Sequence, residues 1–443
     1  MTQKPYQRYK ESGIDWIGKV PEHWEVKPVY SVATIRNGYP FKSELFKSEG
    51  VKSDRLIRIR DIAGDDESIF TEEACPDSAI ISNGDVLIGM DGDFNVHRWM
   101  RGPAKLNQRM CAVSGRTEDV TQFLSRCLPI PLRVINDLAY ATTVKHLSSY
   151  EVLHTRIAVP PTHELANING VLDRETSRID TLISEKERLI ILLQEYRQAL
   201  ISRAVTKGLD PKVKMKDPGV EWLGEVPEHW EVKKLKNISP QITVGIVVEP
   251  SKYYVDNGVP ALRSLNISSG SIIKENFVFI SNEANETLSK SRLNLGDLVV
   301  VRSGQPGTTA VIPKELDGCN CIDLIIIRKP IDVSENYLSL FMNSDLAKLQ
   351  VTFGIGGAIQ QHFNVGMAQN IVIPLPPQSE QTSIASFLDQ ETSRIDTLIS
   401  EARKFIDLLK EYRSSLITAA VTGKIDVREV VPPGSEKREI AHE

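Results

Sequence analysis

The segment "ETSRIDTLISE" occurs twice in the chain, at Glu175–Glu185 and at Glu391–Glu401, without a single difference. The two copies are 391 − 175 = 216 residues apart, and "EYR" recurs at the same offset, at Glu195–Arg197 and Glu411–Arg413. Eleven identical residues in a row do not arise by chance. The sequence is therefore an internal duplication of one plan.

A second marker shows where the repeats differ. "GIDWIGKVPEHWEVK" at Gly13–Lys27 returns as "GVEWLGEVPEHWEVK" at Gly219–Lys233, an offset of 219 − 13 = 206. Between the markers the repeats agree only sparsely, as where "NGDVLIG" at Asn83–Gly89 faces "LGDLVVV". Each repeat thus has a near-identical frame around a divergent middle. We expect the frame to meet the same partner twice and the middles to meet two different ligands.

Each repeat ends in a pattern that predicts a long helix, over roughly residues 162–206 and 378–422. Proline pairs stand just before both segments, and Gly208 and Gly423 follow them, as glycine does past a helix C-terminus. A helix of about 40 residues is roughly 60 Å long, too long for the interior of a domain of about 150 residues. We therefore expect the two helices to pair antiparallel and hold two domains apart, rather than to pack inside one domain.

Apolar residues in both helices follow a heptad, which is typical of a coiled-coil seam. The expected seam residues are Leu172, Ile179, Leu182, Leu189, Leu193, Tyr196 and Leu200, then Leu388, Ile395, Leu398, Ala402, Phe405, Leu409, Tyr412 and Leu416. Lys186 interrupts the first seam where Ala402 stands in the second, and one polar seam residue can set the register. Additional isoleucines, among them Ile183, Ile190, Ile191 and Ile201, widen the stripe.

The marker that opens each repeat holds two tryptophans, Trp16 and Trp24 in the first copy and Trp222 and Trp230 in the second. Because both repeats share this marker, it cannot discriminate between two different ligands. We interpret it as a packed leading segment of each globular domain. His23 and His229 lie inside it, and we interpret them as structural rather than catalytic.

The composition is that of a globular protein, with 443 residues, 41% of them apolar and 25% charged. No run of about 18 apolar residues occurs and the first residues are polar, so we expect neither a transmembrane helix nor an export signal. The five cysteines, Cys75, Cys111, Cys127, Cys319 and Cys321, form no CxxC pair. That pattern predicts reduced thiols in the cytoplasm, and Cys319 with Cys321 are too few for a zinc site.

The spaced motifs resemble a known family. Paired "GxxWxGxVPxHWxV" segments, paired "PLPPQSEQ"-like segments before long helices and paired "AVTGK"-like ends are similar to the specificity subunits of Type I restriction–modification enzymes. The resemblance covers residues 5–428 and is clearest in "PLPPQSEQTSIASFLD" at Pro374–Asp389. Its equivalent, "VPPTHELANINGVLD" at Val159–Asp173, departs at "THEL", which bears only on the first partner contact.

The resemblance implies two target-recognition domains, each reading one half of a bipartite double-stranded DNA site. It also implies that the paired helices bind two DNA-adenine methyltransferase subunits and that a translocating restriction subunit joins the complex. Methyl transfer and cleavage would belong to these partners, and no membrane contact is expected. The identical helix segments would supply the partner-binding residues Glu175, Arg178, Asp180, Glu391, Arg394 and Asp396.

No catalytic site, cofactor or metal is expected in the chain itself. An amino-methyltransferase would show an Asn/Asp-Pro-Pro-Tyr/Phe tetrapeptide, which is missing, and "FGIGG" at Phe353–Gly357 lacks the glycine spacing of an S-adenosylmethionine loop. No Walker-type phosphate loop occurs. Asp85, Asp91 and Asp93 lie close together, but no Glu-x-Lys partner follows them. We interpret that segment as a solvated loop rather than a magnesium nuclease site.

Reading bases requires hydrogen-bonding side chains on exposed loops, with arginine suited to guanine and asparagine or glutamine to adenine. In the first domain the candidates are Arg58, Arg60, Asn95, His97, Arg98, Asn107, Gln108, Arg109, Lys145 and His146. In the second they are Arg263, Arg302, Ser303, Gln305, Thr308, Gln360, Gln361 and His362. His146 and His362 correspond at the offset of 362 − 146 = 216.

The net charge of −5 is unusual for a DNA-binding protein. Residues 1–160 carry equal numbers of basic and acidic side chains, and residues 216–376 carry a small acidic excess. Either the basic residues cluster on one face, or a partner supplies much of the charge that binds phosphate.

These patterns predict an α/β (α+β) chain with two target-recognition domains, residues 1–160 and 209–376, joined by two long antiparallel coiled-coil helices in a pseudo-twofold internal duplication. The helices would occupy residues 161–208 and 377–423, followed by a C-terminal tail at 424–443. An alternative function is a two-domain coiled-coil adaptor that binds proteins or carbohydrate, which the mild acidity favours. A standalone DNA-modifying enzyme is disfavoured by the missing motifs.

Overall fold

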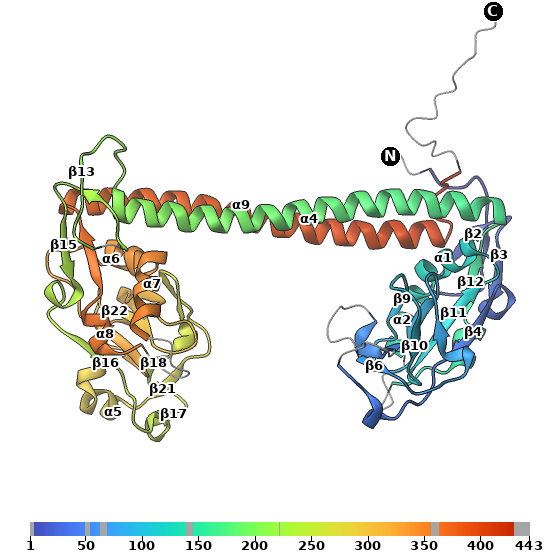
Figure 1. Cartoon of the computed structure of the whole chain (residues 1–443), viewed down its shortest axis with the longest axis horizontal. Helices are drawn as coiled ribbons and strands as arrows, with labels where there is room; N and C mark the ends of the chain where they lie inside the picture. Colours follow the sequence, from blue (N-terminus) through green and yellow to red (C-terminus); the bar gives the residue numbers. More distant parts are fainter. Residues whose placement is uncertain are drawn as a thin grey trace, which may run out of the picture. The chain divides into compact units, whose positions relative to one another are not determined.

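The computed structural model describes residues 4–48, 54–62, 69–138, 145–220, 222–355 and 363–428. The chain forms two compact units, residues 1–185 with 404–443 and residues 186–403. Both long helices, α4 (Thr162–Lys207) and α9 (Gln378–Val421), are divided between the units, so each unit contains one globular domain and half of each helix (Figure 1). The two predicted helices are confirmed, with ends within two residues of those expected.

The globular domain of the first unit is built on two four-stranded sheets. One sheet has the order β6 (Ile69–Thr71), β5 (Asp54–Ile57), β10 (Ala104–Leu106), β7 (Ile80–Ile81), and the other β4 (Ala33–Asn37), β11 (Met110–Gly115), β8 (Val86–Gly89), β9 (Val96–Arg98). The strands β1 (Tyr9–Glu11) and β2 (Lys19–Pro21) pair within the leading segment, and β3 (Glu25–Pro28) pairs with β12 (Arg156–Val159), which joins that segment to the domain. Three helices complete it: α1 (Glu118–Cys127), α2 (Pro129–Leu138) and α3 (Ser149–His154).

The second unit has the same two-sheet plan with little sequence identity, except that the fourth strand of one sheet lies at the opposite edge. Its sheets have the orders β17 (Tyr254–Val255), β21 (Val278–Ile280), β18 (Val259–Leu262), β24 (Asn320–Cys321), and β16 (Ile242–Val244), β25 (Leu324–Ile327), β22 (Leu298–Val301), β23 (Thr309–Val311). The remaining strand pairs are β13 (Met215–Lys216) with β14 (Val226–Pro227), β15 (Glu231–Lys234) with β26 (Val372–Leu375), and β19 (Ile267–Ser268) with β20 (Ser271–Ile272). Its shorter helices are α5 (Asn282–Thr287), α6 (Glu335–Met342), α7 (Asp345–Ile355) and α8 (Val365–Gln369). In each unit one sheet contains a single parallel pair, β5 with β10 or β18 with β24.

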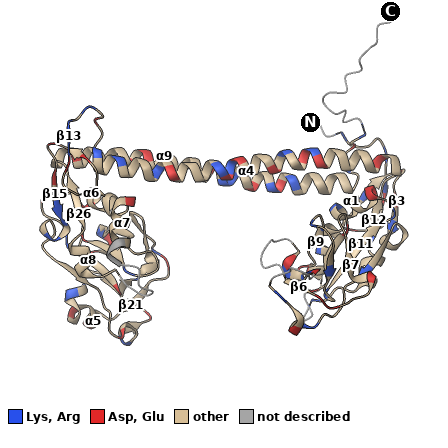
Figure 2. Ribbon diagram, viewed as in Figure 1, with Lys and Arg blue, Asp and Glu red and all other residues tan. Residues whose placement is uncertain are grey.

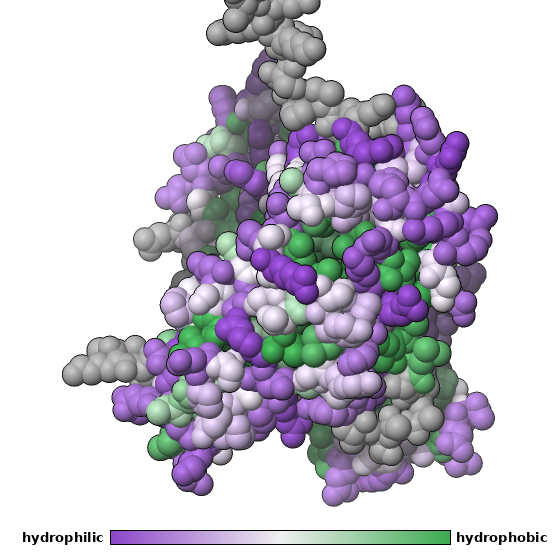
Figure 3. Space-filling model, turned by 90° about the vertical axis from the view of Figure 1, so that its right-hand side faces the viewer, coloured by the Kyte–Doolittle hydropathy of each residue, from purple (hydrophilic) through white to green (hydrophobic). Residues whose placement is uncertain are grey.

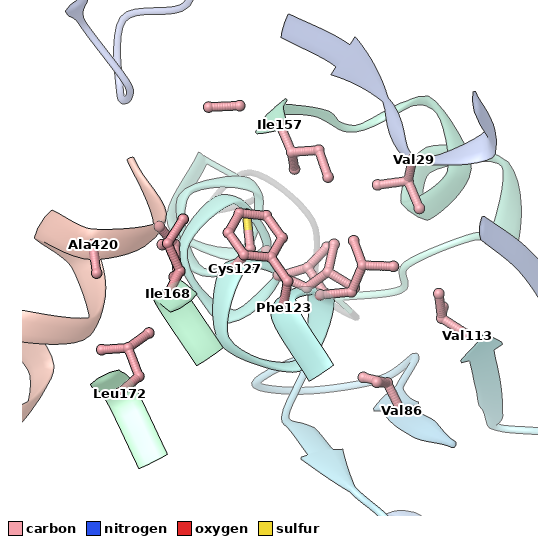
Figure 4. Packing of buried hydrophobic residues seen from close by; sticks show 14 of the residues in the cluster. Val29, Val86, Val113, Phe123, Cys127, Ile157, Ile168, Leu172 and Ala420 are labelled. Atoms are coloured by element: carbon pink, nitrogen blue, oxygen red, sulfur yellow. The ribbon is translucent and has the colours of Figure 1, made fainter. Parts of the chain in front are cut away.

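Helix α1 connects the sheets of the first unit to its long helices. Thr117 caps the helix, because its side chain accepts a hydrogen bond from the amide of Val120. Figure 4 shows Phe123 and Cys127 of α1 between the strands on one side and α4 with α9 on the other. Phe123 is 2% exposed and belongs to the same apolar cluster as Leu172 of α4. The domain and the helices therefore share one core, which explains why the compact units divide within the helices.

The tryptophan-containing marker anchors each domain to the first turn of a long helix. In the first unit Trp24 Nε1 donates to Glu164 Oε2 at 3.0 Å, and His23 Nε2 lies 2.6 Å from Glu164 Oε1. The same contacts recur in the second unit, from Trp230 at 3.0 Å and His229 at 2.7 Å to Glu380. A carboxylate in the first turn also interacts favourably with the helix dipole. The interpretation of the marker as a packed structural segment is confirmed.

Within each unit the long helices run antiparallel. In the first, Arg413 Nε of α9 lies 2.9 Å from Asp180 Oδ1 of α4, while Ala420 belongs to the same cluster as Ile168 and Leu172. In the second, Arg197 Nε lies 3.5 Å from Asp396 Oδ1. These are equivalent pairs, since 180 + 216 = 396 and 197 + 216 = 413.

The predicted heptad register is wrong at alternate seam positions. Leu189 and Tyr196 are 40% and 55% exposed, and their equivalents Phe405 and Tyr412 are 44% and 48% exposed. The side chains that turn inward stand one residue later: Ile183, Ile190 and Arg197 in α4, and Ile399, Ile406 and Arg413 in α9. The sequence offers two apolar heptads one residue apart, so hydrophobicity alone does not choose between them. The arginines decide, because their carboxylate partners lie on the facing helix.

The corrected register can be tested with adjacent aliphatic residues. Ile399 is 7% exposed and Leu398 is 43% exposed. We expect Ile399→Ala to lower the free energy of unfolding by about 2 kcal/mol or more, as buried truncations do, and Leu398→Ala to lower it by less than about 1 kcal/mol. Urea unfolding followed by circular dichroism measures both. A larger loss for Leu398→Ala would restore the original register.

Candidate nucleic-acid interface

Half of the candidate residues of the first domain line one hollow of about 540 Å³. They are Arg58, Arg60, Asn107, Gln108 and Arg109, and the other lining residues are Phe41, Ser43, Phe46 and Ile59. Two strand ends bring them together: Arg58 follows β5, and Asn107 follows its parallel neighbour β10. The hollow thus brings together side chains of the types that suit guanine and adenine, beside a partly apolar lining.

Close backbone packing holds the turn that carries three of these residues. Asn107 N donates to Ile57 O at 3.0 Å, and Asn107 Oδ1 accepts from the amide of Arg109 at 3.2 Å. Gly38 packs against this turn so tightly that a Cβ there would lie 1.9 Å from Asn107 O. A side chain at position 38 would therefore displace the turn.

Carboxylates orient two of the three arginines of the hollow. Asp61 accepts from Arg58 Nε at 2.7 Å and from Nη2 at 3.0 Å. Asp91 accepts from Arg109 Nη1 at 2.9 Å and also lies 2.7 Å from His146 Nδ1. Paired guanidinium groups keep a fixed direction, which favours selective contacts over loose attraction to phosphate.

Asp91 therefore brings a third segment to the edge of the hollow. His146 is exposed and touches Asp91, and Lys145 Nζ donates to Asn136 Oδ1 at 2.7 Å. The segment Gly89–Asn95 is thus tied down by protein contacts. Among the described residues no group of three or more His, Cys, Asp or Glu side chains is placed to hold a metal ion.

The other candidates of the first domain lie on or near β9. Asn95 and His97 are exposed, and Arg98 forms an ion pair with Glu118 at the start of α1. Partial burial lowers the pKa of His97, and the nearby charge of Arg101 lowers it further. His97 is therefore neutral at pH 7 and can donate or accept a hydrogen bond but adds no positive charge.

The second domain presents a different set at the equivalent strand ends. Arg263, like Arg58, begins a short 3-10 helix, and its Nη2 donates to Asn276 O at 2.7 Å. The turn after β24 is shorter than its counterpart and places Asp323 there, in an ion pair with Arg302. The two domains thus share a backbone plan but differ in the charge at this turn.

Of the remaining candidates of the second domain, Ser303 and Gln305 lie in the turn between β22 and β23, and Gln305 is exposed. Thr308 is only 9% exposed, and its hydroxyl donates to Gln305 O at 2.9 Å, so its contact is structural. Gln360, Gln361 and His362 lie outside the described residues.

The partner-binding candidates divide between two sides of the helices. Arg178 and Arg394 are exposed, and Glu175 and Glu391 are half-buried. Asp180 and Asp396 instead form the ion pairs that join α4 to α9 within their units. The identical segments thus serve helix pairing as well as any partner contact.

Sequence reasoning missed the apolar lining of the hollow. Phe41, Phe46 and Ile59 are not spaced by any period, and only the fold brings them beside the arginines. In the described parts of both units, Lys and Arg stand among Asp and Glu along the ribbon (Figure 2). On the end face of the first unit, hydrophobic residues gather in patches across the middle between hydrophilic ones (Figure 3).

Comparison with known proteins identifies the family. The sequence profile of the Type I restriction modification DNA specificity domain matches twice, at residues 21–189 and 227–404. The chain belongs to this family, with one copy of the domain in each repeat. This result decides between the two predicted functions in favour of DNA recognition over an adaptor for proteins or carbohydrate.

Individual relatives match over nearly the whole chain. The specificity subunit of the Type I restriction enzyme EcoBI from Escherichia coli is 26% identical, covering 94% of this chain and 89% of its own. The MjaVIII specificity subunit from Methanocaldococcus jannaschii is 23% identical, covering 95% and 98%.

Solved structures share the fold. A chain from a structure on complex assembly and conformational transition of the type I R-M system has a TM-score of 0.65 at 17% identity, covering 92% of this chain and 99% of that one. The HsdS subunit from Thermoanaerobacter tengcongensis has a TM-score of 0.51 at 16% identity, covering 92% and 98%.

We expect the exposed residues that line the hollow to contribute to base recognition. Arg60 and Gln108 are exposed lining residues. Replacing either by alanine should weaken binding to the cognate site by about 5-fold or more, because a base contact contributes about 1–3 kcal/mol, and should relax the sequence of one half-site only. DNA-binding assays on randomised sites measure this. Arg156→Ala, an exposed arginine on β12 outside the hollow, is the matched control; an equal loss there would remove the hollow from base reading.

Proposed function

We propose that the chain reads a bipartite, asymmetric DNA site, with each repeat contacting one half. The observation that carries this proposal is the hollow of the first domain, where Arg58, Arg60, Asn107, Gln108 and Arg109 converge in a chain whose family profile matches twice. Two domains with the same fold and different side chains at equivalent strand ends are suited to two different half-sites. Because these side chains differ between the two domains, the two halves of the DNA site differ in sequence.

The chain is a specificity subunit, and it leaves the chemistry to other subunits. Its relatives are named specificity subunits of Type I restriction enzymes. Within the proposed complex, methyltransferase subunits transfer the methyl group and restriction subunits translocate and cut. The specificity subunit determines where on the DNA they act.

The duplicated helices support two equal sites for methyltransferase subunits. Beyond the ion-paired Asp180 and Asp396, each helix carries an exposed apolar pair at the offset of 216: Leu192 with Tyr196 and Leu408 with Tyr412. These side chains are 50%, 55%, 61% and 48% exposed, respectively. We assign the partner contact to this side of each helix, together with the exposed Arg178 and Arg394. Equal surfaces presented twice recruit equal partners.

The cytoplasm is the compartment we propose for this activity. All five cysteines are free and four of them are buried. Burial raises the pKa of the Cys111 and Cys127 thiols to about 12, so both stay protonated and unreactive. In the described part of the chain, no helix has the length and apolar character needed to cross a bilayer.

Domain replacement tests the assignment of half-sites. Exchanging residues 28–158 for the same region of another specificity subunit should change one half-site and leave the other, because the second unit is untouched. Genome-wide methylation mapping of cells with the native chain, the exchanged chain or no chain gives the result directly. A map in which both half-sites change would contradict one domain per half-site, and a map that does not depend on the chain would contradict the function.

The partner surface can be tested separately by native mass spectrometry. The native chain should bind two methyltransferase subunits. Tyr196→Asp and Tyr412→Asp should each reduce the complex to one, because each removes one of two equal surfaces, and the double variant should bind none. Tyr30→Asp, an exposed tyrosine (53%) off the helices, should keep both partners. Two bound subunits on the double variant would move the contact elsewhere.

A further inference from the structure

The two units differ at one place where α1 or α6 meets a long helix. In the first unit, Gln122 Nε2 of α1 donates to Asp173 Oδ2 of α4 at 2.7 Å, and Arg126 forms an ion pair with Asp173. Arg126 Nη1 also donates to Asn169 Oδ1 at 3.0 Å. Its side chain is only 13% exposed. A buried guanidinium group thus links the domain to the helix.

The second unit keeps the acceptor and lacks the guanidinium. Counting from the helix caps Thr117 and Ser334, Ser339 stands in the place of Gln122 and Asn343 in that of Arg126. At the offset of 216, Asp389 corresponds to Asp173, in the shared "LD" that precedes "RETSR" or "QETSR", and Ala385 corresponds to Asn169.

Asn343 and Ser339 do not fill the space that the longer side chains occupy in the first unit. Asn343 is 4% exposed and turns to β23, where it donates to Thr309 O at 2.8 Å and accepts from Thr309 N at 3.1 Å. Ser339 is also 4% exposed, and its Oγ has no hydrogen-bond partner among the described residues. Asp389 is exposed, and its carboxylate makes no hydrogen bond or ion pair with the rest of the described chain.

A polar hollow of about 640 Å³ lies at this place. Its lining includes Arg197, Ser339, Asn343, Ala385, Asp389 and Asp396. Arg197 and Asp396 compensate each other at 3.5 Å, so the carboxylate of Asp389 leaves the lining with a net negative charge. A buried hydroxyl without a partner and an uncompensated carboxylate both favour a ligand that is a cationic hydrogen-bond donor.

We propose that this hollow of the second unit binds a guanidinium group, as carried by an arginine side chain of a partner polypeptide. The first unit shows the filled state, because Arg126 supplies the same group to Asp173 from within the chain. Guanidinium fits better than ammonium, since it is planar and can donate to Asp389 and to a second acceptor at once. The proposal does not depend on the DNA contacts of either domain.

The binding test uses acetyl-arginine amide as the probe and the full chain. Ligand-observed saturation-transfer NMR should show saturable binding in the millimolar range, as suits one charge-assisted contact. Acetyl-citrulline amide, which has nearly the same shape without the charge, should bind at least about 10-fold more weakly. Equal binding of the two compounds, or no binding of either, would overturn the proposal.

Variants locate the site. Asp389→Asn, which changes an exposed residue and so preserves the fold, should weaken the binding of acetyl-arginine amide at least about 5-fold. Asp173→Asn in the first unit is the matched control and should leave binding unchanged. Arg126→Ala should open a second site and double the stoichiometry. Unaltered binding in Asp389→Asn would place the ligand elsewhere and reject the hollow.

Discussion

The carboxylate of Glu164, in the first turn of α4, holds the leading segment of the first unit against that helix. It is 1% exposed and accepts from Trp24 Nε1 and from the hydroxyl of Tyr6, with His23 on its other oxygen. Removing it would leave two buried donors without an acceptor, at a cost of about 1–3 kcal/mol for each. Burial raises the pKa of Tyr6, and the contact with Glu164 raises it further, so the phenol stays a hydrogen-bond donor. This one carboxylate therefore fixes the leading segment to the first turn of α4.

The same tryptophan also meets the end of the other helix. Gly423 follows α9 with a φ of 70°, and a Cβ there would lie 2.3 Å from Pro21 and 3.2 Å from Trp24. In the second unit Gly208, with a φ of 72°, approaches Trp230 in the same manner. Glycine is required both for the left-handed conformation and for the space. In each unit one tryptophan therefore contacts the start of one long helix and the end of the other.

Repetition made most of the fold predictable from the sequence. Two identical segments and two spaced markers indicated the long helices, the divergent domains and the family, because sequence identity at fixed offsets does not depend on packing. The seam register was not predictable, since Leu189 and Ile190 are equally apolar and only the facing helix distinguishes them. Half of the lining of the hollow could be predicted, because its arginine and amide side chains are the types that hydrogen-bond to bases. Phe41 and Phe46 could not, because only tertiary folding brings them to the hollow. Thr308 resembled a surface donor but is buried by the turn that it stabilises.

The ion pairs between the helices have a consequence for the ancestry of the chain. Asp180 of the first repeat bonds to Arg413 of the second, and Asp396 of the second bonds to Arg197 of the first. Each repeat therefore contains both partners of this ion pair, an aspartate in the first half of its long helix and an arginine in the second half. Two copies of a half-length chain could form both bonds with each other. Such a homodimer would present the same reading surface twice and select a palindrome. Gene fusion followed by divergence of the two middles converts that symmetry into recognition of two unlike half-sites by one polypeptide.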